Sequence, residues 1–124
     1  MSTSSSYSLG LLILRVGFSV MLLVHGIQHI KILFSSNINF ADPIGLGPVI
    51  TLLLVLFAEI ICTVLIIIGV KTRLATIPPI VLMLVAIIIV HKGDPIMARE
   101  LASLYLLAFS TIGLLGSGRF ALKG

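Results

Sequence analysis

The chain has 124 residues, of which 59% are hydrophobic and only 10% are charged. A soluble domain carries about a quarter charged residues, so this chain has too little polar surface to coat a water-soluble globule. The net charge of +4 does not indicate nucleic-acid binding, because the basic residues stand singly at the ends of apolar runs instead of forming a stripe. The composition predicts a single all-α domain, residues 1–124, that lies in a membrane among lipids.

Four apolar runs have roughly the length of membrane spans, which need about 20 mostly apolar residues in a helix. The predicted spans are residues 9–29, 48–70, 74–90 and 98–116. The connection 71–73 is so short that the second and third spans must be antiparallel neighbours. The one long connection, residues 30–47, is expected as an outer loop on the membrane surface or folded over the bundle. The predicted architecture is a bundle of four transmembrane helices.

The lysines and arginines predict the orientation, because the cytoplasmic ends of spans carry an excess of them. Four spans place both termini on one side of the membrane. That side carries four basic residues and no acidic residue, whereas three basic and three acidic residues fall on the other side. The first set is Lys71, Arg73, Arg119 and Lys123, and the second is Lys31, Lys92 and Arg99 with Asp42, Asp94 and Glu100. Both termini are therefore predicted to be cytoplasmic.

Two charged residues fall inside predicted spans, Arg15 in the first and Glu59 in the second. A charge within the hydrocarbon region is costly and generally has a partner or a function. Counted from the cytoplasmic ends of the two helices at about 1.5 Å per residue, the two side chains differ in depth by only a few ångström. The sequence therefore predicts a buried Arg15–Glu59 ion pair. Such a pair either fixes how the two helices dock or belongs to a proton- or ligand-responsive site.

A second group of polar residues gathers at the outer ends of the helices. His25 and His29 share one face of the first helix, His91 ends the third, and Glu100 opens the fourth with Tyr105 after it. Three interpretations stay open. The group binds a metal, or the histidines sit at the bilayer interface because one ring edge is apolar and the other wet. In the third interpretation it lines an outward-facing pocket for a small amphipathic ligand such as a quinone, with histidine and glutamate exchanging protons.

The remaining features bear on packing and on chemistry. Gly17, Gly26 and Gly113 are expected where helices approach each other closely. The single cysteine, Cys62, excludes dithiol chemistry within the chain. Metal-ligand spacing is too weak to assign a metal, and the sequence shows no nucleophile–base set or phosphate loop. The chain is therefore not expected to be an enzyme on its own.

The order of these residues resembles the DoxX family of small bacterial membrane proteins, from about Leu11 to Phe120. The family pattern has an arginine, a glycine and a His-Gly pair in helix one, Ala-Glu in helix two, and a glycine with Thr-Arg after it. It continues with a histidine ending helix three, a glutamate and a tyrosine in helix four, and a final Gly-x-Gly-Arg-aromatic. The matching residues are Arg15, Gly17, His25, Gly26, Ala58, Glu59, Gly69, Thr72, Arg73, His91, Glu100, Tyr105, Gly116, Gly118, Arg119 and Phe120.

The resemblance implies a four-helix, multi-pass protein of the bacterial inner (plasma) membrane. Named relatives include a subunit of thiosulfate:quinone oxidoreductase and a membrane component of oxidative-stress systems, and related four-helix proteins act as cargo receptors or assembly factors. The expected function is a ligand-binding, quinone-linked membrane subunit that acts with a soluble redox partner. Its alternatives are a non-catalytic assembly factor or scaffold and a small-molecule transport protein, and a homodimer stays open.

Overall fold

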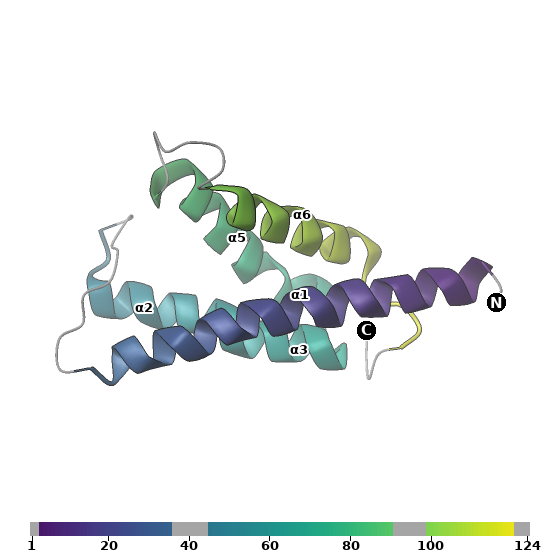
Figure 1. The fold of residues 1–124 in the computed structure, drawn as a ribbon, viewed down its shortest axis with the longest axis horizontal. Helices are drawn as coiled ribbons and strands as arrows, with labels where there is room; N and C mark the ends of the chain where they lie inside the picture. Colours follow the sequence, from purple (N-terminus) through teal and green to yellow (C-terminus); the bar gives the residue numbers. More distant parts are fainter. Residues whose placement is uncertain (1–2, 36–44, 91–98, 121–124) are drawn as a thin grey trace.

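The computed structural model describes residues 3–35, 45–90 and 99–120 of the chain. Figure 1 shows α1 running the length of the molecule, with α2 and α3 along it and the pair α5 and α6 above them. The elements in chain order are α1 (Thr3–Leu33), α2 (Pro48–Leu56), the π-helical segment η1 (Phe57–Ile61), α3 (Cys62–Ile68), α4 (Thr72–Ala75), α5 (Ile77–Val85), the π-helical segment η2 (Ala86–Val90) and α6 (Glu100–Leu115).

The elements α2, η1 and α3 follow one another without a break and form one rod. Pro48 stands in its first turn, where the missing N–H costs no hydrogen bond. The rod ends at Gly69, whose left-handed backbone (φ 79°) lets its N–H donate to the Leu65 carbonyl at 2.9 Å. The chain then turns through α4 into α5, which packs back against η1. The second and third spans are therefore neighbours.

Three helical stretches are long and apolar enough to cross a membrane: Ser5–Leu33, Pro48–Ile68 and Thr72–Ile89. The fourth helix, α6, is a shorter apolar helix of 16 residues. The predicted all-α membrane bundle is confirmed by these helices. With 31 residues α1 is about 46 Å long, which exceeds the ~30 Å hydrocarbon core, so α1 extends beyond the predicted span 9–29 at both ends.

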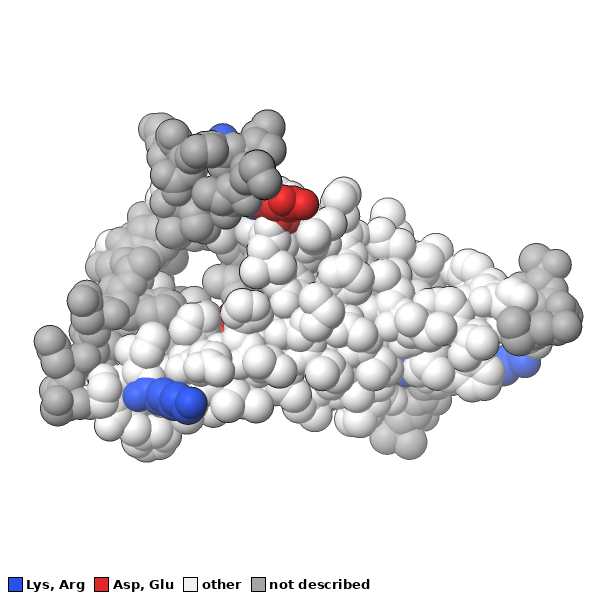
Figure 2. Space-filling view, in the orientation of Figure 1, with Lys and Arg blue, Asp and Glu red and all other residues white. Residues whose placement is uncertain are grey.

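The bundle is apolar both inside and outside. Its core is formed by residues of all the long helices, among them Leu22, Cys62, Ile66, Phe109 and Ile112. Large apolar side chains also cover the outer surface, where Ile13, Leu54, Val81, Leu107 and Leu114 are exposed. Figure 2 shows a long uncharged middle, with most of the charged residues in view near the edges of the molecule. Water would hydrate such a surface unfavourably, so the outer face is suited to lipid.

The start of α1 and the segment that follows α6 lie at one end of the bundle. The guanidinium of Arg119 donates to the hydroxyl of Ser5 at 3.5 Å, which joins these two described segments. A bundle with an even number of spans has this arrangement.

Candidate functional site

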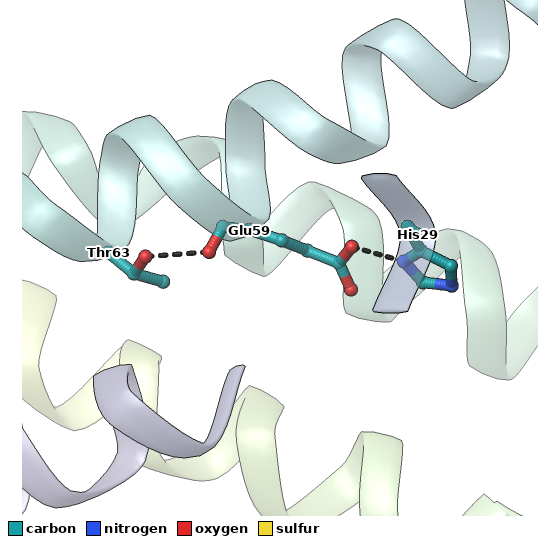
Figure 3. Close-up of polar contacts among 3 residues, drawn as sticks. All are labelled: His29, Glu59 and Thr63. Atoms are coloured by element: carbon teal, nitrogen blue, oxygen red, sulfur yellow. Dashed lines mark hydrogen bonds and ion pairs between the residues drawn. The ribbon is translucent and has the colours of Figure 1, made fainter. Parts of the chain in front are cut away.

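Glu59 lies at the centre of η1, halfway along the membrane span Pro48–Ile68. Its side chain is 5% exposed, and its carboxylate oxygen Oε1 contacts Nδ1 of His29 on α1 (Figure 3). The His29 side chain is 26% exposed, so the pair joins a buried carboxylate to an imidazole that is partly accessible. A carboxylate at this depth needs such a partner, because the hydrocarbon region offers no water to solvate it.

The local backbone around Glu59 is π-helical. In a π-helix the hydrogen bonds run from residue i to i+5, and the Cys62 N–H donates to the Phe57 carbonyl in this way. The Thr63 hydroxyl donates to the Glu59 carbonyl at 2.6 Å and lies 3.0 Å from the Ile60 carbonyl, which satisfies backbone acceptors beside the widened turn (Figure 3). Single π-helical turns within α-helices are frequent at functional sites.

Gly26 brings α1 close enough for His29 to reach Glu59. A Cβ atom on Gly26 would lie 2.7 Å from Cγ1 of Ile60 and 3.0 Å from Cβ of Glu59. The first distance is shorter than real Cβ contacts and the second is tighter than most of them, so the neighbours would have to shift. His29 follows three residues later on the same face of α1. The close approach predicted for Gly26 is therefore present. Gly113 makes a similar one against Thr76, because a Cβ atom on Gly113 would lie 2.8 Å from the Thr76 hydroxyl oxygen. Gly17 faces open space instead.

An aromatic cluster lies beside α1 on the N-terminal side of His29. The buried ring of Tyr105 on α6 stands edge-on to Phe18 and to His25, each at a centroid distance of 6.0 Å, and stacks on Phe109 at 6.2 Å. His25 is exposed, so it connects the buried phenol to the outer face of α1. His25 and His29 are four residues apart and face different partners, the phenol of Tyr105 and the carboxylate of Glu59.

The structure brings together some of the residues that were predicted to gather at the outer ends of the helices. His25 contacts Tyr105, and His29, predicted as a neighbour of these residues, is the partner of Glu59. Glu100 opens α6 with an exposed side chain, five residues before Tyr105. His91 lies outside the described residues. Glu59, which the sequence predicts to pair with Arg15, joins His29 instead, and the spacing of residues within one helix carries no information on this contact between helices.

Arg15 and Glu59 do not pair in the structure, which corrects the prediction. The Arg15 side chain is buried and donates to the carbonyls of Ser117 and Phe120, each at 2.5 Å, and to that of Ile67 at 3.3 Å. Arg15 thus lies level with the end of α3, while His29 stands 14 residues along α1, about 21 Å away.

The physical reason is the offset between α1 and its neighbours. Hydropathy places the start of the first helix at Leu9, whereas α1 begins at Thr3 and extends past the end of α3. At that level the guanidinium meets carbonyls that the end of a helix and the glycine-rich C-terminal segment leave without intrahelical donors. Five N–H donors in a fork suit several such acceptors. Arg15 therefore holds the C-terminal segment against α1 and α3 through these hydrogen bonds.

Within residues 3–35, 45–90 and 99–120, no three histidine, cysteine, aspartate or glutamate side chains lie together as a metal site. The chemistry of the described site is that of a carboxylate–imidazole pair beside an imidazole and a phenol, all groups that donate, accept or hold protons.

The model of the DoxX family matches residues 10–92 of the chain. The match covers two thirds of the sequence, from α1 through η2, and includes both His29 and Glu59. No curated protein and no solved structure matches the chain.

Proposed function

The chain belongs to the DoxX family of membrane proteins, and from this premise we propose that it is a quinone-linked subunit of the bacterial inner membrane. Its binding site would be the His29–Glu59 pair together with His25 and Tyr105. The observation that carries the proposal is Glu59, a carboxylate buried at mid-membrane depth and joined to a partly accessible histidine. Intramembrane carboxylate–histidine pairs serve proton relays and ligand sites far more readily than they serve stability.

The chemistry of a quinone fits these groups. Reduction of a quinone to a quinol adds two electrons and two protons to the two carbonyl oxygens. The His29 imidazole is placed to hold a proton between Glu59 and a ligand, and His25 is placed beside the Tyr105 phenol for the same task. The partly exposed ring of Phe18, which stands edge-on to the buried Tyr105 ring, would offer a quinone ring an aromatic contact.

The electrons come from elsewhere in this proposal. The chain has one cysteine, the buried Cys62, and therefore no dithiol of its own. A soluble redox partner would supply the electron pair while this chain holds the quinone and exchanges the protons. We also propose that both termini face the cytoplasm, because the end of the bundle with Lys71, Arg73 and Arg119 is the more basic one.

The proposal is tested by titrating the full-length protein in detergent with a short-chain ubiquinone and a short-chain menaquinone. Glu59→Gln keeps the shape of the side chain and removes its charge. We expect this substitution to weaken quinone binding by about tenfold or more, equivalent to roughly 1.4 kcal/mol. The matched control is Lys31→Gln, which removes an exposed charge from the last turn of the same helix as His29 and should bind as the wild type does.

Two outcomes would contradict the proposal. One is a wild-type protein that binds neither quinone, in which case a lower thermal stability of Glu59→Gln would favour a scaffold or assembly function. The other is equal binding by wild type and Glu59→Gln, which would place any quinone away from the His29–Glu59 pair.

A further inference from the structure

A cavity of about 540 Å³ opens at the end of the bundle where the α3–α4 turn meets the C-terminal segment. Two basic side chains, Lys71 and Arg73, line it together with the backbone of 116–118 and two leucines. This end carries the Thr-Arg and Gly-x-Gly-Arg motifs of the sequence, which the proposed quinone site does not use. Two segments more than 40 residues apart along the chain, 71–74 and 115–118, thus line the same cavity.

The cavity is held together by buried polar contacts. The Ser117 hydroxyl donates to the Thr72 hydroxyl at 2.5 Å, and the Arg15 guanidinium holds the Ser117 carbonyl from the other side. Gly116 has a left-handed backbone (φ 80°), and a Cβ there would lie 3.0 Å from Nε of Arg73. Glycine at 116 suits the positive φ of this turn and leaves room for the Arg73 guanidinium to lie against the chain. The two segments form a built site with defined walls.

Lys71 adopts a conformation that its side chain disfavours. Its φ is +48°, and it is the one non-glycine residue with positive φ in the described ranges. Glycine or asparagine would meet the needs of this turn with less backbone strain. Strain of this kind collects at functional sites, where the side chain is needed in that place. The turn therefore places a lysine at the cavity, although its backbone conformation is one that lysine disfavours.

The charge at this end is one-sided. Lys71, Arg73 and Arg119 are exposed there. The acidic residues that the structure describes are Glu59, at mid-span, and Glu100, at the opposite end of α6. No described acidic side chain therefore neutralises the cavity, which lies at the boundary between the apolar bundle and water. Such a place attracts an anion.

We propose that this cavity binds a phosphate group, and that the phosphate belongs to the headgroup of an anionic phospholipid. The guanidinium fork of Arg73 and the ammonium of Lys71 would contact the phosphate oxygens. The exposed side chains of Leu74 (63%) and Leu115 (40%), which line the cavity, provide an apolar surface for the acyl chains. Basic sites next to membrane helices recognise anionic headgroups in this way. The site is separate from the His29–Glu59 pair and stands without the quinone proposal.

Native mass spectrometry of the full-length protein in detergent tests the proposal. The probes are phosphatidylglycerol, phosphatidylcholine with the same acyl chains, and inorganic phosphate alone. The test variant combines Lys71→Asn with Arg73→Gln. Asparagine accepts left-handed backbone, so the turn keeps its conformation while the charge is lost. Lys31→Gln, which removes one basic side chain from the far end of α1, is the control for a lost charge away from the cavity, and helix content by circular dichroism checks the fold of each variant.

We expect wild type and Lys31→Gln to retain phosphatidylglycerol in preference to phosphatidylcholine. The double variant should lose this preference, with retention lowered by about tenfold or more, as the loss of two basic residues near an anionic headgroup implies. An unchanged preference in the folded double variant would overturn the site, as would an equal loss in Lys31→Gln. Retention of inorganic phosphate without any preference for phosphatidylglycerol would overturn the assignment to a lipid.

Discussion

At the scale of single residues, Glu59 carries the proposed chemistry. It is a carboxylate in the middle of a membrane span, and its partner is a histidine whose ring still reaches the surface. An arginine partner would have locked the carboxylate in its ionised form, since arginine does not release its proton in proteins. A histidine partner releases and takes up a proton near neutral pH. With His29 in place of Arg15 as its partner, Glu59 belongs to a pair that is able to transfer a proton.

Arg15 gives a residue-scale prediction about stability. Arg15→Leu leaves the carbonyls of Ser117 and Phe120 buried or half-buried without their donor, so we expect it to lower the free energy of unfolding by about 1–3 kcal/mol. Arg15→Lys should recover only part of the loss, because an ammonium presents no planar fork to several carbonyls. Carboxypeptidase digestion of the C-terminus should be faster in both variants. Digestion at the wild-type rate in Arg15→Leu would show that Arg15 does not fasten this segment.

The residues themselves were partly predictable. That Arg15 and Glu59 are buried and partnered follows from the cost of a charge in hydrocarbon, and the structure shows both. Which partner each takes depends on how far one helix is displaced along its neighbour. A displacement of one helical turn, about 5.4 Å, exchanges the partners of a buried side chain. Hydropathy defines the ends of a span too coarsely to resolve such a step.

At the scale of elements, two π-helical segments distinguish the structure from a plain helical bundle. The segment η1 contains Glu59, and η2 (Ala86–Val90) ends at the residue before His91. A run of apolar residues has the same composition in α- and π-helical form, so neither segment could be predicted from the sequence. The small residues were better guides, because Gly26 and Gly113 do sit at close contacts between helices.

Gly26 and Gly17 form a matched pair for an element-scale prediction. Gly26→Ala would force α1 away from η1, since its Cβ would lie 2.7 Å from a side-chain atom of Ile60 and 3.0 Å from Cβ of Glu59. We expect a loss of about 1–3 kcal/mol in unfolding free energy, as for other overpacked contacts, together with weaker quinone binding. Gly17→Ala meets open space and should be neutral or stabilising by up to about 1 kcal/mol. Thermal unfolding in detergent compares the two, and equal effects would refute the close contact at Gly26.

At the scale of the whole molecule, the bundle has two chemically different ends and a mid-membrane pair between them. The composition and the order of apolar runs were enough to predict an all-α membrane protein, and the family match confirms the class. The cavity between Arg73 and Gly116 was not predictable, because it depends on how the C-terminal segment folds back onto the α3–α4 turn. Long-range contacts of this kind leave no periodic trace in a sequence.

The central claim, that Glu59 and His29 exchange protons with a bound quinone, is tested most directly by infrared difference spectroscopy. The spectrum of the full-length protein with quinone minus that without quinone should contain a carboxyl signal, which isotope exchange into deuterated water would shift. The account predicts that this signal is present in wild type and in Lys31→Gln and is lost in Glu59→Gln. A carboxyl signal that persists in Glu59→Gln, or a wild-type spectrum without one, would contradict it.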